Sequence, residues 1–436
     1  MRAGHQAGGG SARLPAGLRP VTALTRVTTA ELFFDLVFVF AFIQVTSLVT
    51  ENPSALGLAR GLLVLAVLWW SWSLFAWLGN RIRANYGITR LVLLAATPIM
   101  FVLAATIREA FDDFPGGLDG PVVFAAGYTA LRLLHLALHW YATPGMTARA
   151  ALALVVPMVG AAVLLFAAAV APQHVFDRPR AVDLAQLGCW VLAVLVDYSA
   201  GLALPARDRQ VFAARHWTER HGLIMIAAIG EALIAIGLGG SDLATSWELI
   251  GASVLAVVVA GALEWTYFDV AALAGEQSMQ QATPEHRATL ARDAYSYLHL
   301  PMIAGIILLA LGLKKMPAFV DPTLRHPNTR LPSLGVWSLY GGAALFLLGH
   351  VAFQLRITHL IRTIIRPRLV TALLLVALVP AAMMLPALWA LGLLAASGLG
   401  LVLVEIVVAD GQRRRLRESA QAEESGPGGE PAGPTS

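Results

Sequence analysis

Apolar runs long enough to cross a bilayer recur along the whole chain, and they constrain its fold more than any other feature. A helical run of about 20 apolar residues matches the hydrocarbon thickness of a membrane. Only 13% of the 436 residues are charged, whereas soluble domains carry about 25%. The chain therefore lacks the charged shell that soluble domains need. The sequence predicts an all-α fold, a polytopic transmembrane helical bundle of about twelve spans.

Each predicted span is placed by its length and apolar content, with ends defined to within a few residues. The spans cover residues 31–49, 57–78, 89–107, 121–141, 149–171, 183–204, 221–240, 247–270, 294–313, 334–354, 369–386 and 388–408. The short connection near Pro386 leaves open whether the last two segments cross the membrane or form a re-entrant hairpin. Discontinuous helices are expected in transporters, and Pro98, Pro157 and Pro301 are the candidate kinks.

The composition divides the chain into three parts. Residues 1–27 are rich in Gly, Ala, Arg and Pro, which predicts a disordered N-terminal segment without a cleavable signal peptide. Residues 28–410 form the transmembrane helical domain, and residues 411–436 form a basic and then disordered tail. Cys189, the one cysteine, has no partner for a disulfide or a metal site. We expect no cofactor.

The basic residues mark one side of the membrane. If the N-terminus is cytoplasmic and all twelve spans cross, 22 of the 31 basic residues fall on the cytoplasmic side and eight on the other, with Arg132 inside a span. This bias predicts a multi-pass protein of the cytoplasmic (inner) membrane with both termini cytoplasmic. Anionic lipid then accounts for the net positive charge, and no nucleic-acid partner is expected. The oligomeric state is left open.

Ionisable residues within the apolar runs are costly, so each is a candidate for function. In the first span, Thr28 and Glu31 fit a helix capping box. Asp35 lies one turn deeper on the same face as Glu31. Two interpretations of Asp35 stay open, a structural contact and the lining of a polar cavity.

The seventh span carries a basic and acidic cluster at its start and a single acid deeper in. His216, Glu219 and Arg220 are close in sequence, and an interfacial charge network is one interpretation of them. Glu231 follows Arg220 by eleven residues, which returns to nearly the same helical face about 16 Å deeper. This depth places Glu231 near the bilayer midplane. Intramembrane acids commonly mark ion or proton paths, so we expect Glu231 to have a functional role.

The fourth span holds Arg132, with His135 and His139 one and two turns further on. Arg132 is a candidate counter-ion for Glu231 or Asp35, and a structural salt bridge between helices is the alternative. The two histidines have the spacing of a metal-ligand pair, but no adjacent Glu supports a zinc site.

Other polar groups share the cytoplasmic half of the predicted bundle. The candidates are Asp269 in the eighth span, His299 in the ninth and His350 in the tenth, with Asp197, Gln354 and Glu405 as further polar residues. A water-filled vestibule open to the cytoplasm accommodates them all. The second span ends in a tryptophan cluster, Trp69, Trp70, Trp72 and Trp77, for which we favour an interfacial aromatic belt.

Four motifs follow one another along the chain. They are ELFFDLVFVFAF from Glu31, HWTERHGLIMIAAIGE from His216, YSYLHLPMIAG from Tyr295 and LGHVAF from Leu348. Together they resemble the signature of the bacterial low temperature requirement protein A (LtrA) family. The resemblance covers residues 28 to about 408. Glu264 stands where the family usually has a second Trp before Tyr-Phe-Asp, so it is not expected to be a shared functional residue.

What the resemblance implies is a multi-spanning membrane protein named for a growth phenotype in the cold. The resemblance supports the residues at the motif positions as functional candidates, but it does not imply what chemistry they perform. Those positions are Glu31, Asp35, His216, Glu219, Arg220, Glu231, Asp269, His299 and His350.

The function that the residues favour is a transporter or channel for a small ion, a proton or a polar solute. Asp35 and Glu231 would be the coupling or selectivity acids, with Arg132, Arg220 and the histidines as counter-charges. Two alternatives stay open, a membrane-embedded enzyme acting on a lipid or isoprenoid and a non-catalytic protein needed for growth in the cold. The acids are scattered one per helix, which favours a pathway over a catalytic cluster.

Overall fold

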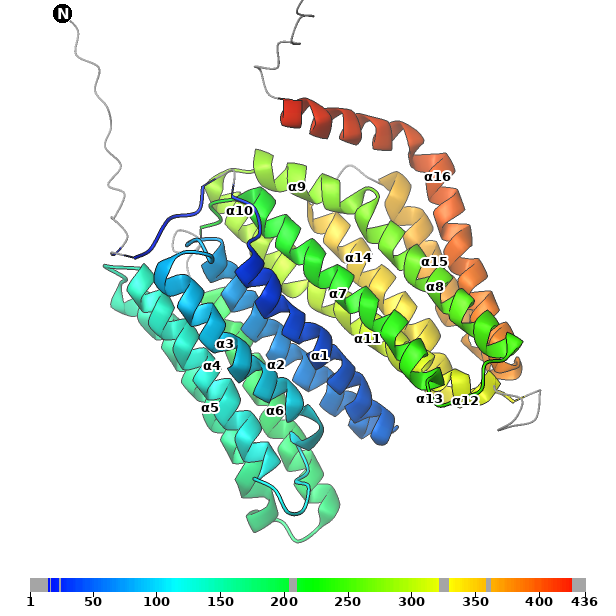
Figure 1. Cartoon of the computed structure of the whole chain (residues 1–436), viewed down its shortest axis with the longest axis horizontal. Coiled ribbons are helices and arrows are strands. Elements are labelled where there is room, and N and C mark those ends of the chain that lie inside the picture. The colour runs from blue at the N-terminus through cyan, green and yellow to red at the C-terminus, as the bar shows by residue number, and fades with distance from the viewer. Residues whose placement is uncertain are drawn as a thin grey trace, which may run out of the picture.

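The computed structural model describes residues 15, 17–22, 25–203, 210–320, 329–357 and 362–425, and these residues contain helices and no β-strand. Twelve of the helical segments are long and apolar enough to cross a membrane (Figure 1). The predicted all-α class and the number of spans are therefore confirmed. Within the two segments predicted to be disordered, 1–14 and 426–436 lie outside the described residues, and residues 411–425 continue the last helix.

The first six spans form a first unit, which occupies one side of the molecule in Figure 1. Its helices are α1 (Thr29–Glu51), α2 (Ala55–Gly79), α3 (Gly87–Ala105), α4 (Gly120–Ala142), α5 (Ala148–Val175) and α6 (Pro179–Ala203). The helix α1 packs on α2 and α3, and the chain then packs in order, α3 on α4, α4 on α5 and α5 on α6. The last helix, α6, returns to pack on α2.

The remaining spans form a second unit, on the other side of the molecule. Its helices are α7 (Ala214–Gly240), α8 (Trp247–Phe268), α9 (Ala271–Gln281), α10 (Pro284–Leu290), α11 (His299–Lys315), α12 (Pro317–Val320), α13 (Ser333–Val336), α14 (Gly342–Ile357), α15 (Arg362–Met384) and α16 (Ala387–Ser425). Two π-helical segments, η3 (Ala291–Tyr297) and η4 (Trp337–Gly341), lead into α11 and α14.

The two units share one packing order. In the second unit α7 packs on α8 and α11, α11 on α14, α14 on α15, α15 on α16, and α16 returns to α8. Six spans bring the chain back to the end of the bundle at which it started, so α1 and α7 begin at the same end. We call this the basic end and the other the opposite end. The fold is thus two six-span units of the same topology and orientation, joined where α1 packs on α7 and α11.

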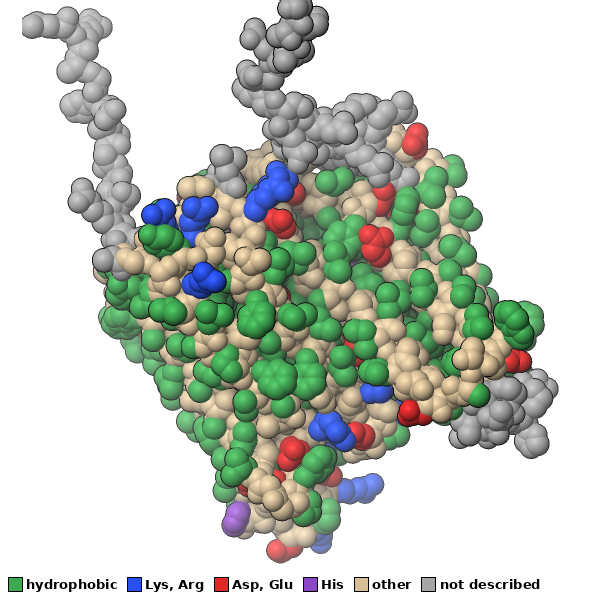
Figure 2. Space-filling view, in the orientation of Figure 1, with side chains coloured by type: hydrophobic (Ala, Val, Ile, Leu, Met, Phe, Trp, Pro, Cys, Tyr) green, Lys and Arg blue, Asp and Glu red, His purple; other side chains and the backbone are tan. Residues whose placement is uncertain are grey.

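An apolar belt surrounds the bundle between its two ends. Figure 2 shows hydrophobic side chains over the middle of the visible face and most charged side chains gathered toward the two ends. Large apolar side chains such as Leu91, Leu195 and Val254 are exposed on this belt. A belt of this kind suits lipid and not water, because exposed apolar surface of such extent is unfavourable in water. The chain is an integral membrane protein.

The irregular backbone lies at the π-helical segments and not at the predicted kinks in α3 and α5. Those two helices continue through Pro98 and Pro157. Pro301 occupies the first turn of α11, where a missing N–H is tolerated. In η3 the bonds widen to five residues, as in the Leu298 N–H to Asp293 carbonyl bond of 3.1 Å. Such segments often mark functional positions in helices.

Close packing of α11 on α14 depends on glycine. A Cβ at Gly305 would stand 2.5 Å from the Phe346 nitrogen and 2.6 Å from the Gly342 oxygen. Both are backbone atoms, which cannot move aside cheaply. Small residues let membrane helices approach this closely, and the gain is van der Waals contact between backbones.

We predict that Gly305→Ala lowers the free energy of unfolding by about 1–3 kcal/mol, because the added methyl overpacks this contact. The measurement is the thermal unfolding midpoint of the purified protein in detergent. Gly261→Ala is the matched control, since a Cβ there meets nothing within 4 Å. Equal midpoints for the two variants would contradict the close helix contact.

Candidate functional site

A buried charge cluster joins the two units at the basic end. The Arg220 guanidinium of α7 donates from Nη2 to Asp35 Oδ1 at 3.1 Å and from Nη1 to Glu31 Oε1 at 3.1 Å. His216, one turn earlier on α7, lies 3.0 Å from the same Glu31 oxygen. All four side chains are nearly or fully removed from solvent. We call these four residues the interface lock.

Local structure explains how α1 presents its two acids. The capping box forms as the spacing suggests, because the Thr28 side chain accepts from the Glu31 N–H and Glu31 Oε2 accepts from the Thr28 N–H at 3.0 Å. This contact holds Oε2 of Glu31 at the helix start, where Arg220 reaches Oε1 and His216 Nε2 lies 3.0 and 3.1 Å from the two oxygens. Asp35, one turn deeper, meets the same guanidinium because residues four apart share a helical face.

The helix α2 supports the lock from the first unit. Trp72 Nε1 donates to Asp35 Oδ1 at 2.7 Å, and the Phe75 carbonyl accepts from Arg220 Nη1 at 3.2 Å. Gly79 gives the lock room, since a Cβ there would stand 2.6 Å from Glu31 Oε1 and 2.8 Å from Arg220 Nη1. The positive charge is thus surrounded by acceptors, which is what makes its burial tolerable.

Asn80 fixes the tautomer of His216, although no motif in the sequence points to this residue. Asn80 Oδ1 accepts from the Phe212 N–H at 2.7 Å, so its amide nitrogen is the donor toward His216 Nδ1 at 3.2 Å. His216 Nδ1 therefore accepts, and Nε2 carries the proton that it donates to Glu31. Glu219, the remaining member of the predicted cluster, accepts from the Val27 N–H at 3.3 Å and stays outside the lock.

Glu231 lies elsewhere on the same interface. It is past the middle of α7, nine residues before Gly240 and so nearer the opposite end than the midplane expectation. The side chain is 1% exposed, and its Oε2 has no hydrogen-bond partner. Thr46 of α1 and Lys314 of α11 are the polar groups that act on it. Lys314 itself donates to Ser47 of α1 at 2.8 Å.

Arg132 does not pair with Glu231 or Asp35, so that expectation is wrong. Its guanidinium binds Asp197 of α6 with both terminal nitrogens, at 2.8 and 3.2 Å. The Tyr128 hydroxyl, one turn earlier on α4, donates to the same carboxylate at 2.7 Å. The pair is buried within the first unit and ties α4 to α6, which is the structural alternative.

His350 belongs to a third buried cluster, within the second unit. Arg368 of α15 donates to Glu405 of α16 at 2.5 Å and to His350 Nδ1 of α14 at 2.7 Å. The predicted span 369–386 leaves Arg368 in a connection, whereas α15 begins at Arg362 and the Arg368 side chain is fully buried. Each unit therefore contains its own buried arginine and acid pair that anchors the sixth span.

His299 lies in a cluster of aromatic rings around the start of α11. Its Nε2 accepts from the Tyr267 hydroxyl at 2.9 Å because its Nδ1 donates to the Ala294 carbonyl at 3.0 Å. His221 stands with its ring centroid 5.2 Å from that of His299. Trp69 stacks on His299 at 6.3 Å between centroids. Trp69, Trp70 and Trp72 are all buried, so the expected interfacial aromatic belt is wrong for these three residues.

The predicted vestibule groups therefore occupy separate places. The structure brings together Glu31, Asp35, His216 and Arg220, and it separates them from Glu231, from Arg132 and from His350. Asp269 caps the C-terminal end of α8 at the basic end. His135 and His139 line a cavity between α2, α4 and α5.

Comparison with known proteins agrees with this architecture. The model of the bacterial low temperature requirement A protein (LtrA) family matches residues 26–404. The chain therefore belongs to the LtrA family. It is also 26% identical over 348 residues to an uncharacterized protein of Rhizobium meliloti (strain 1021), an alignment that covers 75% of this chain and 77% of the relative. No solved structure matches the chain.

The Arg132–Asp197 pair provides a test of its structural role. Removing one partner of a buried pair leaves an unpaired charge and costs about 3–5 kcal/mol, whereas removing both with apolar residues is often near neutral. We predict that Arg132→Met alone destabilises the protein by that amount and that Arg132→Met with Asp197→Leu recovers most of it. The measurement is a double-mutant cycle of unfolding midpoints. Additive losses would contradict the direct pairing.

Proposed function

We propose that this protein is a secondary transporter for a small ion or polar solute, working by movement of its two six-span units against each other. The observation that carries the proposal is the interface lock. It joins α1 of the first unit to α7 of the second at the basic end. Parallel repeats whose interface holds the transport path are a recurrent transporter architecture.

Glu231 supports the proposal from the other half of the same interface. It is an intramembrane carboxyl with an unpartnered oxygen, and it faces Thr46 of α1 and Lys314 of α11. Binding of a proton or a cation would supply the missing partner of that oxygen. Glu231 would then be the coupling group, and the lock would close the basic end while the group is accessible from the opposite end.

The orientation follows the distribution of basic residues. With 22 of 31 on one side, we infer that the basic end and both termini face the cytoplasm and that the membrane is the bacterial cytoplasmic membrane. Transport by this mechanism requires two conformations that differ at the two ends of the α1–α7 interface.

The lock is expected to set the population of the two conformations. We predict that Asp35→Asn combined with Arg220→Gln opens the basic end, because the neutral pair no longer attracts across the interface. One pair of spin labels, at Asn85 and His286, spans the two units at the basic end. A second pair, at Ala55 and Asp242, spans them at the opposite end. All four positions are exposed. The distance at the basic end should lengthen, and that at the opposite end should shorten.

The labels require a background without the native Cys189, which Cys189→Ser provides. Arg90→Gln is the control, since it removes an exposed positive charge at the same end without touching the lock. Single and unchanged distances in both variants, with normal folding, would argue against movement between the units.

Flux tests the role of Glu231. In proteoliposomes with a trapped pH dye and a potassium diffusion potential, we predict proton or alkali-cation flux above that of empty vesicles. Glu231→Gln should reduce the flux at least about tenfold, because the amide cannot exchange a proton. Glu248→Gln, an exposed acid at the opposite end, should leave it unchanged. A folded Glu231→Gln variant with the flux of the unaltered protein would exclude the proposed coupling role.

A further inference from the structure

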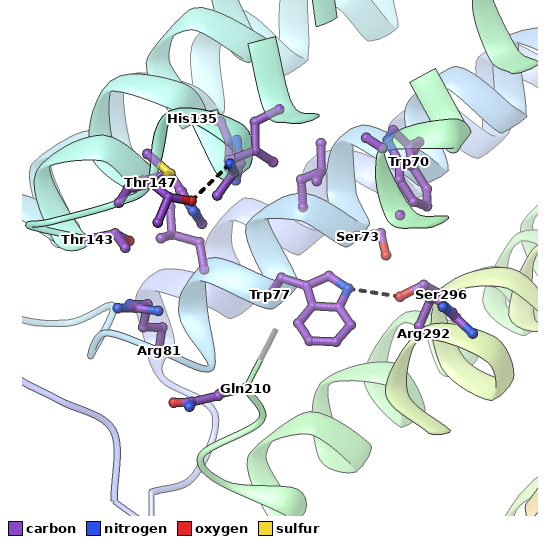
Figure 3. A pocket seen from close by; sticks show the side chains of 18 of the residues that line it. Trp70, Ser73, Trp77, Arg81, His135, Thr143, Thr147, Gln210, Arg292 and Ser296 are labelled. Atoms are coloured by element: carbon purple, nitrogen blue, oxygen red, sulfur yellow. Dashed lines mark hydrogen bonds between the residues drawn. The ribbon is translucent and has the colours of Figure 1, made fainter. Parts of the chain in front are cut away.

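A cavity of about 270 Å³ opens among the helix ends at the basic end, away from the interface lock (Figure 3). It lies between the end of α2, the end of α4, the start of α5, the end of α6 and the segment η3. Its volume is near the lower limit of small-molecule sites in proteins. Neither the lock residues nor Glu231 line it, so nothing in the transport proposal accounts for it.

One face of α2 forms the floor. Trp70, Ser73 and Trp77 recur at helical spacing along it, and Arg81 follows just beyond the end of the helix. The positions run about 12 Å along the axis from Ser73 to Arg81 at 1.5 Å per residue. The cavity is therefore elongated, with Trp70 and Ser73 deep in it and Arg81 toward the helix end. Figure 3 shows the Trp77 ring between these two regions, held by its 3.0 Å hydrogen bond to Ser296.

Several polar atoms of the lining have no partner. Ser73 Oγ, Arg81 Nε and Thr143 Oγ1 are buried without a hydrogen bond, and Ser73 as a whole is 1% exposed. All three residues line this cavity. Buried donors that remain unsatisfied cost about 1–3 kcal/mol each. Their number in one small cavity indicates a ligand that supplies acceptors at both its deep and its outer region.

The charge of the lining is positive. Arg81 and Arg292 contribute to it, and no Asp or Glu is among the described residues that line the cavity. Arg292 shares its charge with Asp293 at 2.5 Å. Burial lowers the pKa of the Arg81 guanidinium from its ordinary value, and no charged group offsets this effect. An anion would offset the cost of burying that cation.

The walls are apolar and aromatic. Leu74, Leu154 and Met146 line the cavity together with the rings of Trp70 and Trp77. A bare inorganic ion would leave these walls without contact, whereas a ring or short chain would fill them. The lining therefore suits a molecule with an anionic head and an apolar body.

We propose that this cavity binds an organic oxyanion, with its phosphate or carboxylate head at Arg81 and Thr143 and its apolar body along Trp77, ending in a hydrogen-bond acceptor at Ser73. A free metabolite and the headgroup region of an anionic lipid share this chemistry. The site shares no residue with the interface lock and does not include Glu231.

The test uses phenyl phosphate as the probe, because it combines a phosphate head with a ring of suitable size. Calorimetric titration into the protein in phosphatidylcholine nanodiscs should give saturable binding at least about tenfold tighter than that of phenol or inorganic phosphate. Arg81→Gln should weaken phenyl phosphate at least about tenfold, as expected for a lost charge-assisted hydrogen bond. Ser73→Ala should leave the affinity for phenyl phosphate unchanged, because the phenyl ring offers the Ser73 hydroxyl no acceptor.

Arg90→Gln is the matched control, an exposed arginine at the same end that does not line the cavity. It should bind phenyl phosphate as the unaltered protein does. Binding no tighter than that of phenol, or equal affinities for Arg81→Gln and Arg90→Gln, would overturn the proposal. Arg81→Lys, which keeps the charge, separates loss of binding from loss of folding, since it should retain part of the affinity.

Nanodiscs containing phosphatidylglycerol distinguish the two sources of the ligand. If a lipid headgroup occupies the cavity, phosphatidylglycerol should weaken phenyl phosphate binding to the unaltered protein and leave the residual binding of Arg81→Gln unchanged. If the ligand is a free solute, the affinity should be the same in both lipids. Each of these two results supports an oxyanion site and shows whether its ligand is a lipid headgroup or a free solute.

Discussion

A guanidinium removed from water loses several kcal/mol of solvation, and the whole α1–α7 interface is arranged around meeting that cost for Arg220. Two carboxylates, a backbone carbonyl and the ring face of Trp72 surround it, and Gly79 leaves the space for them. The same constraint recurs within each unit, where Arg132 meets Asp197 and Arg368 meets Glu405. Each of these buried arginines is thus paired with at least one acid from another helix, and each pair holds two helices together.

Glu231 differs from these paired charges, and it makes the two ends of the α1–α7 interface unlike. One of its oxygens is buried without a hydrogen bond, and it belongs to the same interface as the lock but nearer the opposite end. An interface that is closed by charge at one end and incomplete at the other has two different ends. That difference is the physical basis of the proposed movement between the units, because a ligand that completed the second end would change the balance between the two.

The spans could be predicted from sequence because apolar length is a local property, and α1 to α6 begin and end within a few residues of their expected positions. Partners could not be predicted in the same way. Arg132 meets an acid two spans later in the chain, which depends on how α4 and α6 pack. The burial of Trp69 could not be predicted, because an apolar ring can pack against lipid as well as against the protein core. Asn80 and Arg368 were missed because they border connections, where polar residues are ordinary.

The division of charge in the lock has a consequence for the two units themselves. Both acids come from the first unit, and both bases come from the second. Two copies of the first unit would bring carboxylate against carboxylate, and two copies of the second would bring guanidinium against guanidinium. The two units share a topology but are not interchangeable. If the chain were cut between α6 and α7, the opposite charges of the lock would favour pairing of a first unit with a second unit over pairing of two identical units.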